Sequence, residues 1–265
     1  MFANTQTKQA GKINFKRMGP KTYQDNFFDF HLQDSINSAR EIIPIVLKYI
    51  QPTSVVDVGS GIGTWLSTWE KHGVTDIVGV DGNYVDKEKL LIEKNQFITA
   101  DLENGFMIKR QFDLVECLEV AEHIHPANAG RFIESLCQLG DIVLFSAAIP
   151  GQEGTMHYNE QYPDFWIDLF ARNNFTPYDC IRQQVWTNDK VSWWYRQNVM
   201  FFIHDSAKEK YPSIIKEYQS VLCMVHPELL KYKSAKAANY EKILRNPFTV
   251  LRYFAGRFLS KIKTR

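Results

Sequence analysis

The stretch Ser54–Trp65 constrains the fold of this chain more than any other part of it. A β-branched run leads into an acidic residue, Asp57, and three glycines follow at alternate positions, Gly59, Gly61 and Gly63. Glycine lets the backbone take a positive φ and lets a ligand approach closely. The helical pattern that follows points its N–H groups at such a ligand. The stretch therefore predicts a strand, a tight turn and a helix N-terminus that bind a nucleotide-like molecule.

Apolar runs and helical patterns alternate along the chain. Strands are expected at Thr75–Val80, Phe97–Leu102, Phe112–Glu119 and Asp141–Ala147, and helices at Ser35–Ile50, Thr64–His72, Val85–Glu93 and Ala127–Leu139. Continuous apolar runs are typical of strands that are buried on both faces of a parallel sheet. The alternation predicts an α/β fold with a doubly wound, mostly parallel sheet.

Acidic residues stand where four of these strands end: Asp57, Asp81, Asp101 and Glu119. In a doubly wound sheet the ligand lies beyond the carboxyl ends of the strands, so these side chains are expected at one edge. Asp81 follows the glycines by about 20 residues, which is the spacing of an acid that binds ribose hydroxyls. Two of the acids also have a structural interpretation, Asp81 as a helix N-cap and Asp101 as an exposed loop residue.

The motif Asp57-x-Gly59-x-Gly61-x-Gly63 resembles the first motif of class I S-adenosylmethionine (SAM) methyltransferases, whereas dinucleotide sites have the spacing G-x-G-x-x-G. The resemblance implies a seven-stranded Rossmann-like sheet with SAM as cofactor, and it implies that Asp101 meets the adenine. The cofactor-binding residues that it implies are Asp57, Gly59, Gly61, Gly63, Asp81, Asp101, Leu102 and Glu119. A nicotinamide-dependent oxidoreductase is the alternative, and both the glycine spacing and the lack of a Tyr-x-x-x-Lys motif after the fourth strand argue against it.

The chain of 265 residues has a net charge of +1, and this charge is unevenly distributed. Residues 206–265 carry 13 Lys and Arg against 4 Asp and Glu, so the part before them is acidic. We expect a flexible N-terminal segment (1–25), a methyltransferase domain (26–205) and a basic helical extension (206–265). The four cysteines form no C-x-x-C pair, and neither a transmembrane run nor a signal peptide is evident, so a cytoplasmic protein is expected.

The end of the chain, 246–265, has helical periodicity with one apolar face that Arg and Lys flank. Two interpretations stay open. The face packs on the domain or on a second subunit, or it lies peripherally on the anionic inner face of a membrane. The same positive charge suits nucleic acid less well than these two partners, and nucleic acid is not expected as a partner.

Two segments that follow the fourth and fifth expected strands carry candidate catalytic residues. The first, Glu116–His125, includes Glu119, and the second, Ile149–Pro163, is a long loop of the kind that is usually functional. Methyl transfer from SAM needs an aligned nucleophile, and a base when that nucleophile is a hydroxyl. His157 is the candidate base because histidine titrates near neutrality. Its structural alternative is a hydrogen bond within the loop.

A metal site is a second interpretation of the same segments. Glu119, Glu122 and His123 stand at i, i+3 and i+4, which share one face of a helical turn, and His157 is the candidate fourth ligand. The arrangement resembles the E-x-x-E-H…H metal pattern of small-RNA 2′-O-methyltransferases, and E-x-x-E-H also occurs in quinone-type O-methyltransferases. Such ligands suit Mg²⁺, Mn²⁺ or Zn²⁺. Without a metal, Glu119 is expected near the methyl group, and Glu122 and His123 brace the loop.

From about Tyr23 to Phe202 the chain is similar to stand-alone bacterial SAM methyltransferases that accompany glycosyltransferases in surface-polysaccharide gene clusters. The shared stretches are Ser54–Trp65, Val78–Tyr84, Leu118–His123, Phe145–Gln161 and Trp193–Asn198. This resemblance implies a saccharide hydroxyl as acceptor. Trp193 and Trp194 would stack on a sugar ring or fill the core, and Arg196 would pair with a phosphate or a carboxylate.

The leading hypothesis is therefore a SAM-dependent O-methyltransferase that acts on a small-molecule or glycan acceptor, with His157 as base and Glu119 beside the methyl group. A SAM-binding assembly protein without catalytic activity is a further alternative. The complete set of candidate acids argues against it.

Overall fold

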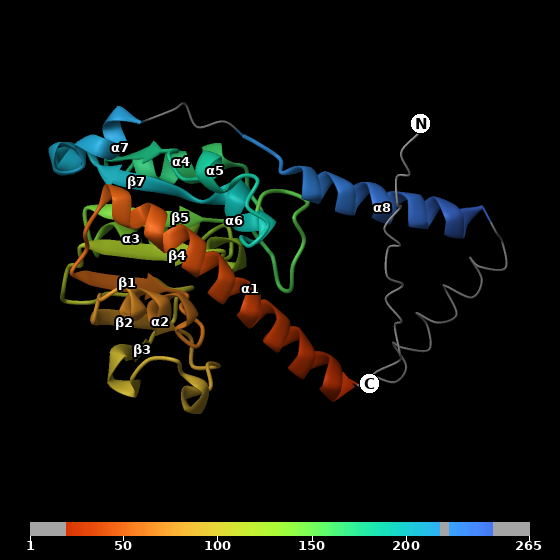
Figure 1. Ribbon diagram of the computed structural model, residues 1–265, viewed down its shortest axis with the longest axis horizontal. Coiled ribbons are helices and arrows are strands. Elements are labelled where there is room, and N and C mark those ends of the chain that lie inside the picture. The colour runs from red at the N-terminus through yellow and green to blue at the C-terminus, as the bar shows by residue number, and fades with distance from the viewer. Residues whose placement is uncertain (1–19, 218–222, 246–265) are drawn as a thin grey trace, which may run out of the picture.

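The computed structural model describes residues 20–217 and 223–245. Its centre is a seven-stranded sheet of order β3-β2-β1-β4-β5-β7-β6 (Figure 1). The strands are β1 Ser54–Val58, β2 Asp76–Asp81, β3 Phe97–Thr99, β4 Leu114–Leu118, β5 Ile142–Ser146, β6 Phe175–Tyr178 and β7 Met200–His204. Neighbouring strands are parallel except that β7 is antiparallel to both β5 and β6. The expected doubly wound, mostly parallel, seven-stranded sheet is confirmed.

Helices cover both faces of this sheet. The helices are α1 Pro20–Tyr49, α2 Thr64–Lys71, α3 Ala129–Cys137, α4 Pro163–Ala171, α5 Arg182–Val185, α6 Trp193–Asn198, α7 Pro212–Lys216 and α8 Pro227–Leu244. The expected helices Thr64–His72 and Ala127–Leu139 are confirmed as α2 and α3. Helix α1 covers the expected Ser35–Ile50 helix except for its last residue, with Pro44 inside it.

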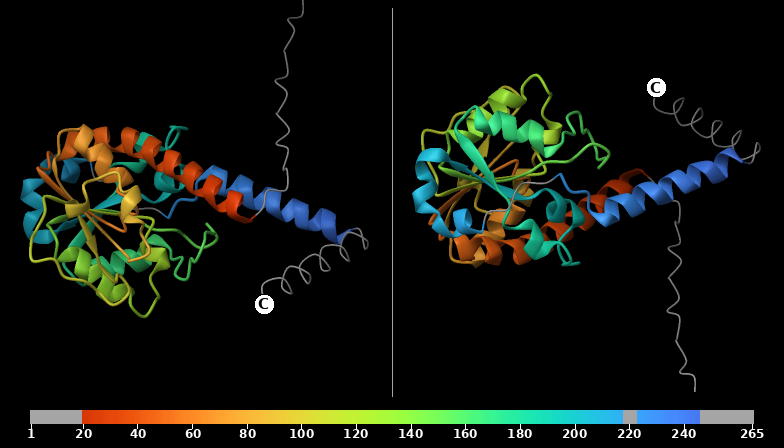
Figure 2. Two further views of the ribbon diagram at one scale, coloured as in Figure 1. Left: turned by 90° about the horizontal axis from the view of Figure 1, so that it is seen from below. Right: turned by 90° about the horizontal axis from the view of Figure 1, so that it is seen from above.

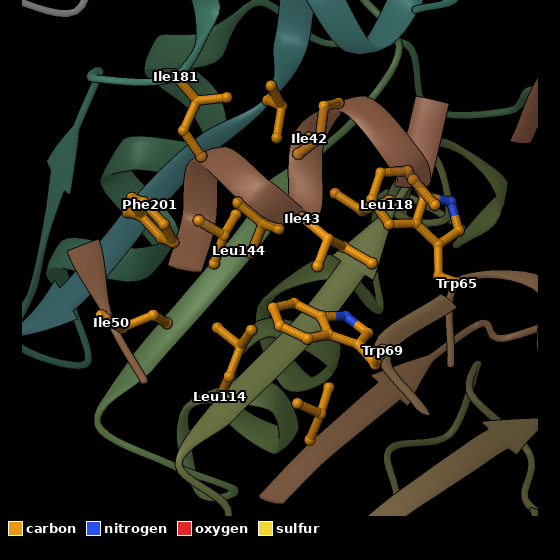
Figure 3. Close-up of a cluster of buried hydrophobic side chains, with 14 of the residues drawn as sticks. Ile42, Ile43, Ile50, Trp65, Trp69, Leu114, Leu118, Leu144, Ile181 and Phe201 are labelled. Atoms are coloured by element: carbon orange, nitrogen blue, oxygen red, sulfur yellow. The ribbon is translucent and has the colours of Figure 1, made fainter. Parts of the chain in front are cut away.

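Two hydrophobic clusters hold these layers together, one on each face of the sheet. The first contains residues of α1, α2 and α6, and Figure 3 shows Ile42 of α1, Trp69 of α2 and Leu114 of β4 among its members. The second contains residues of α3 and α4. Side chains alternate along β1, so that Val55 belongs to the first cluster and Val56 to the second. Burial on both faces explains why the strands are apolar throughout.

The expected helix at Val85–Glu93 is wrong. The segment between β2 and β3 holds two short 3₁₀ turns, η1 Lys87–Lys89 and η2 Lys94–Gln96. The N–H of Leu91 donates to the carbonyl of Ile62 in the glycine turn (2.8 Å), and Ile92 is buried against that turn. These tertiary contacts outweigh a local helical preference, which is weak in any short segment.

The region after β7 continues the fold before it leaves the sheet. A 3₁₀ helix, η4 Asp205–Lys210, and α7 place Ala207 and Ile214 in the first hydrophobic cluster. Helix α8 then extends away from the sheet (Figures 1 and 2). Within the described ranges, none of the helices combines the length and apolarity needed to cross a bilayer. The predicted amphipathic segment 246–265 lies outside the described residues, as do residues 1–19 of the expected flexible segment.

The glycine turn between β1 and α2 needs its glycines for two different reasons. Gly59 and Gly61 both have positive φ values, 85° and 53°, in the left-handed region that disfavours other residues. A Cβ atom on Gly59 would also lie 2.2 Å from the side chain of Val120, whereas a Cβ on Gly61 would meet no atom within 4 Å. Gly59 is therefore constrained by backbone strain and by packing, and Gly61 by backbone strain alone.

This difference predicts unequal effects of two matched substitutions. Gly59→Ala should lower the free energy of unfolding by about 1–3 kcal/mol more than Gly61→Ala does, because only the first adds an overpacked contact. Denaturant unfolding of both variants, followed by far-UV circular dichroism, measures the difference. Equal destabilisation would show that Val120 does not pack closely on the turn.

Candidate functional site

Asp81 at the end of β2 binds the glycine turn. One carboxylate oxygen accepts the N–H of Gly61 (2.7 Å), and the other accepts the N–H of Gly82 (2.6 Å) and the hydroxyl of Tyr84. The tyrosine is strongly exposed, so its hydroxyl reaches the carboxylate from the solvent side. Asp81 therefore lies beside the turn and the N-terminus of α2, as the motif predicts.

Asp57 lies behind the turn, in a buried pair of acids. Its register partner on β4 is Glu116, and both side chains are buried. Burial, with the charge of Asp81 as a second cause, raises the pKa of Asp57 to about 8. Burial and the charge of Asp57 raise the pKa of Glu116 well above its usual value, and Trp69 Nε1 donates to this carboxyl (3.3 Å). Glu116 opens the candidate segment Glu116–His125, but its motif assigned it no role, although an acid inside an apolar run was a signal.

Asp101 and Leu102 follow β3 in a short turn. The carboxylate of Asp101 is exposed and accepts the N–H of Glu103 (3.0 Å) and the side-chain amide of Asn104 (2.6 Å). Leu102 is buried in the second hydrophobic cluster. Asp101 thus caps a local turn, and its contact with adenine stays a prediction.

Glu119 occupies a strained position directly after β4. Its φ is 57°, its N–H donates to the carbonyl of Ser146 (2.9 Å), and its carboxylate points into a buried polar cluster. Gln152 donates to one carboxylate oxygen (2.5 Å) and Asn198 to the other (3.1 Å). Burial raises the pKa of Glu119, and these hydrogen bonds oppose the rise. Non-glycine residues with positive φ concentrate at functional sites.

The partners of Glu119 come from two elements far apart in the sequence. Gln152 belongs to the loop between β5 and α4, and Asn198 ends α6. Asn198 also donates to the side-chain oxygen of Gln152 (2.9 Å), so the three groups form one network. No sequence pattern singled out Gln152 and Asn198, because an isolated amide side chain gives no periodic signal.

His157 lies in the same loop, between two carboxylates. Its Nδ1 is 3.1 Å from Glu160 and its Nε2 is 4.0 Å from Glu122. Glu160, which no sequence pattern singled out, further accepts the N–H groups of Gly151 (2.7 Å) and Glu153 (2.6 Å). Because a carboxylate only accepts, Nδ1 of His157 is the donor in this pair, and Nε2 faces the buried carboxyl group of Glu122.

Glu122 is the least satisfied polar group near His157. It is fully buried, and in the described part of the chain neither of its carboxylate oxygens has a hydrogen-bond partner. Burial, and then the charge of Glu119, raise its pKa well above the usual value. The ring of His123 contacts that of His157 edge to face, with centroids 4.8 Å apart, and its Nδ1 donates to the carbonyl of Met156 (3.2 Å). Burial, and then the charge of His157, lower the pKa of His123, which favours a neutral imidazole.

Three of the four candidate metal ligands come together. Ligand atoms of Glu122, His123 and His157 all lie within 4.8 Å of one another. Glu119 does not belong to this group, because its carboxylate accepts hydrogen bonds from Gln152 and Asn198. One carboxylate and two imidazoles fit Mn²⁺ or Zn²⁺ with water completing the coordination, and the orphaned oxygens of Glu122 suit such an ion.

The aromatic and basic residues of α6 contact other residues of this chain. Arg196 is buried, pairs with the carboxylate of Glu228 on α8 (2.6 Å), and donates to the carbonyl of Trp186 (3.4 Å). Trp193 and Trp194 are half-buried and contact each other edge to face. The anion that Arg196 binds is therefore a carboxylate of this chain.

Comparison with known proteins agrees with this fold. A family model described as a methyltransferase domain matches residues 31–195, more than half of the chain. The sugar N-methyltransferase KedS8 from Streptoalloteichus is 13% identical, with 76% of this chain and 99% of that chain covered and a TM-score of 0.52. The magnesium protoporphyrin IX methyltransferase of Synechocystis with bound SAH is 19% identical, with 74% and 90% covered and a TM-score of 0.46. The search of curated proteins finds no match.

The family match covers the glycine turn, the acids at the ends of β1, β2 and β4, and the loop that carries His157. The strand order, with β7 antiparallel at one side of the sheet, is the arrangement that the SAM-binding motif implies. The chain therefore belongs to the methyltransferase domain family and has the class I fold, whose cofactor is SAM.

Proposed function

We propose that this methyltransferase transfers the methyl group to a hydroxyl of a saccharide or glycoconjugate precursor, with His157 as general base. The observation that carries the proposal is the pairing of His157 with Glu160. Glu160 holds the Nδ1–H tautomer, so the lone pair of Nε2 is available to a hydroxyl proton. A base is needed for a hydroxyl acceptor, because a neutral hydroxyl is a weak nucleophile.

The residues around the site have different roles in the reaction. The cofactor, when bound, supplies a methyl group on a positively charged sulfur. Asp81 and the glycine turn orient the cofactor at the edge of the sheet, and Glu119 lies toward the loop. His157 Nε2 would take the hydroxyl proton as the acceptor oxygen replaces the sulfur at the methyl carbon, and the sulfur would keep the electron pair of its former bond to that carbon.

The surface next to His157 supports a saccharide acceptor. Tyr158 and Tyr162, on the same loop, are 58% and 52% exposed. Aromatic faces of this kind stack on the apolar faces of sugar rings, and their hydroxyls make hydrogen bonds. KedS8 is described as a sugar N-methyltransferase and the Synechocystis enzyme acts on a protoporphyrin, so the shared fold accommodates several acceptors. The support for a saccharide acceptor therefore comes from the exposed tyrosines of the loop and from the resemblance to methyltransferases of surface-polysaccharide gene clusters.

A metal-assisted O-methyltransferase is the second candidate. The observation in its favour is the buried carboxylate of Glu122, which lacks hydrogen-bond partners in the described residues and lies beside two imidazoles. Glu122, His123 and His157 would hold the ion. A divalent ion there would lower the pKa of an acceptor hydroxyl.

A substitution at His157 tests the leading proposal. With labelled SAM and a panel of nucleotide sugars and oligosaccharides, His157→Gln should lower the transfer rate by about 10²- to 10⁴-fold, because the base is lost. Affinity for S-adenosylhomocysteine, measured by calorimetry, should stay unchanged. The control is His125→Gln, which alters an exposed histidine of the segment after β4. Equal losses of rate and affinity would make His157 a structural residue and end its role as base.

Chelator treatment separates the two candidates. The metal-free mechanism predicts that the chelator-treated protein keeps its transfer rate toward whichever saccharide in the panel accepts the methyl group. A loss of rate that Mn²⁺ or Zn²⁺ restores, and that the metals fail to restore in His123→Ala, would favour the metal-assisted candidate instead. Rate measurements with and without added metal decide between these outcomes.

A further inference from the structure

Helix α8 binds the loop that carries His157 through one exposed carboxylate. Glu153 accepts a hydrogen bond from the hydroxyl of Tyr232 (3.0 Å), and it pairs with Lys233 (2.5 Å) and Lys236 (2.6 Å). These partners span little more than one turn of α8, so a single face of the helix surrounds the carboxylate. The two lysines, as the largest cause, lower the pKa of Glu153 to about 2, so the contact is charged at neutral pH. Figures 1 and 2 show the loop beside the first turns of α8.

A second, buried contact joins the start of α8 to the same loop. The N–H of His226, one residue before α8, donates to the side-chain oxygen of Gln197 (2.8 Å). Gln197 donates to the side-chain oxygen of Gln152 (3.3 Å), and Gln152 in turn donates to Glu119 (2.5 Å). Two hydrogen-bonded side chains, Gln197 and Gln152, thus connect the residue before α8 to the carboxylate of Glu119.

Within the loop, Glu160 links Glu153 to the candidate base. One oxygen of Glu160, Oε1, accepts both the N–H of Glu153 (2.6 Å) and Nδ1 of His157 (3.1 Å). Glu153 itself has a φ of 61°, so its backbone holds a conformation that an unrestrained loop would rarely adopt. A displacement of Glu153 would therefore disturb the hydrogen bond that sets the tautomer of His157.

We infer that Glu153 is a positioning residue, and that α8 acts through it to hold His157 in the orientation that methyl transfer needs. This inference rests on the proposed function, because it assigns the positioned group as the base. A single exposed ion pair contributes little. Here three donors from one helix face converge on one carboxylate, and the neighbouring residue Gln152 is fixed from the buried side. Helix α8 is then one wall of the acceptor site, although it lies outside the matched methyltransferase domain.

Amide exchange and histidine NMR on the full chain test this inference without a known acceptor. Glu153→Gln, and separately Lys233→Glu with Lys236→Glu, should speed exchange of the amides of Gly151 and Glu153 by about threefold to tenfold. In both variants the ring ¹⁵N shifts of His157 should move away from the Nδ1–H tautomer. Affinity for S-adenosylhomocysteine should stay within about twofold, because the contact lies away from the glycine turn.

A charge swap and a matched control make the test specific. Glu153→Lys combined with Lys233→Glu and Lys236→Glu should restore slow exchange and the wild-type shifts. The control Glu241→Gln removes a carboxylate from the far end of α8, where its partner is Arg245 (3.8 Å), and should change neither readout. Unchanged exchange and shifts in Glu153→Gln, or failure of the swap to restore them, would overturn the inference. If these readouts behave as expected but no saccharide is methylated, the positioning stands and the proposed acceptor falls.

Discussion

The cofactor edge of this protein depends on the carboxylate of Asp81. By accepting the N–H of Gly61, it joins the end of β2 to the turn between β1 and α2. The same turn accepts a hydrogen bond from Leu91, and Gly59 packs against Val120 after β4. The end of β2, the segment that follows it and the segment after β4 therefore all contact the glycine turn. A helix N-terminus held in this way presents fixed N–H groups, so little ordering is needed when an anionic or polar ligand binds.

A second junction organises the loop after β5. Glu119, Gln152 and Asn198 come from three different elements, and their hydrogen bonds attach the loop after β5 to the end of β4. Further along this loop, Glu160 binds His157 and two backbone N–H groups. The loop has no helix or strand of its own, but side-chain contacts fix it at both places. Preorganisation of this kind is what alignment of a nucleophile with a methyl group requires.

Local sequence patterns predicted most of the fold. The apolar runs and the glycine spacing predicted the parallel strands and the position of Asp81, because period and turn chemistry act over a few residues. They failed at Val85–Glu93, where Leu91 and Ile92 dock on a distant turn. They also missed the amides and the acid that hold the site, Gln152, Asn198 and Glu160. The roles of Gln152 and Asn198 depend on contacts between segments far apart in the chain, and the role of Glu160 depends on how its irregular loop folds, neither of which a periodic pattern encodes.

Titration of the protein with S-adenosylhomocysteine, in the wild type and in Asp81→Asn, tests the central claim most directly. Removing the charge should weaken binding by about 10- to 100-fold, because the charge-assisted hydrogen bond to the turn is lost together with the predicted one to the ribose. Asp86→Asn, at the exposed N-cap of η1, is the matched control and should bind like the wild type. Equal affinity in the wild type and Asp81→Asn would contradict the account, and so would the absence of binding by the wild type.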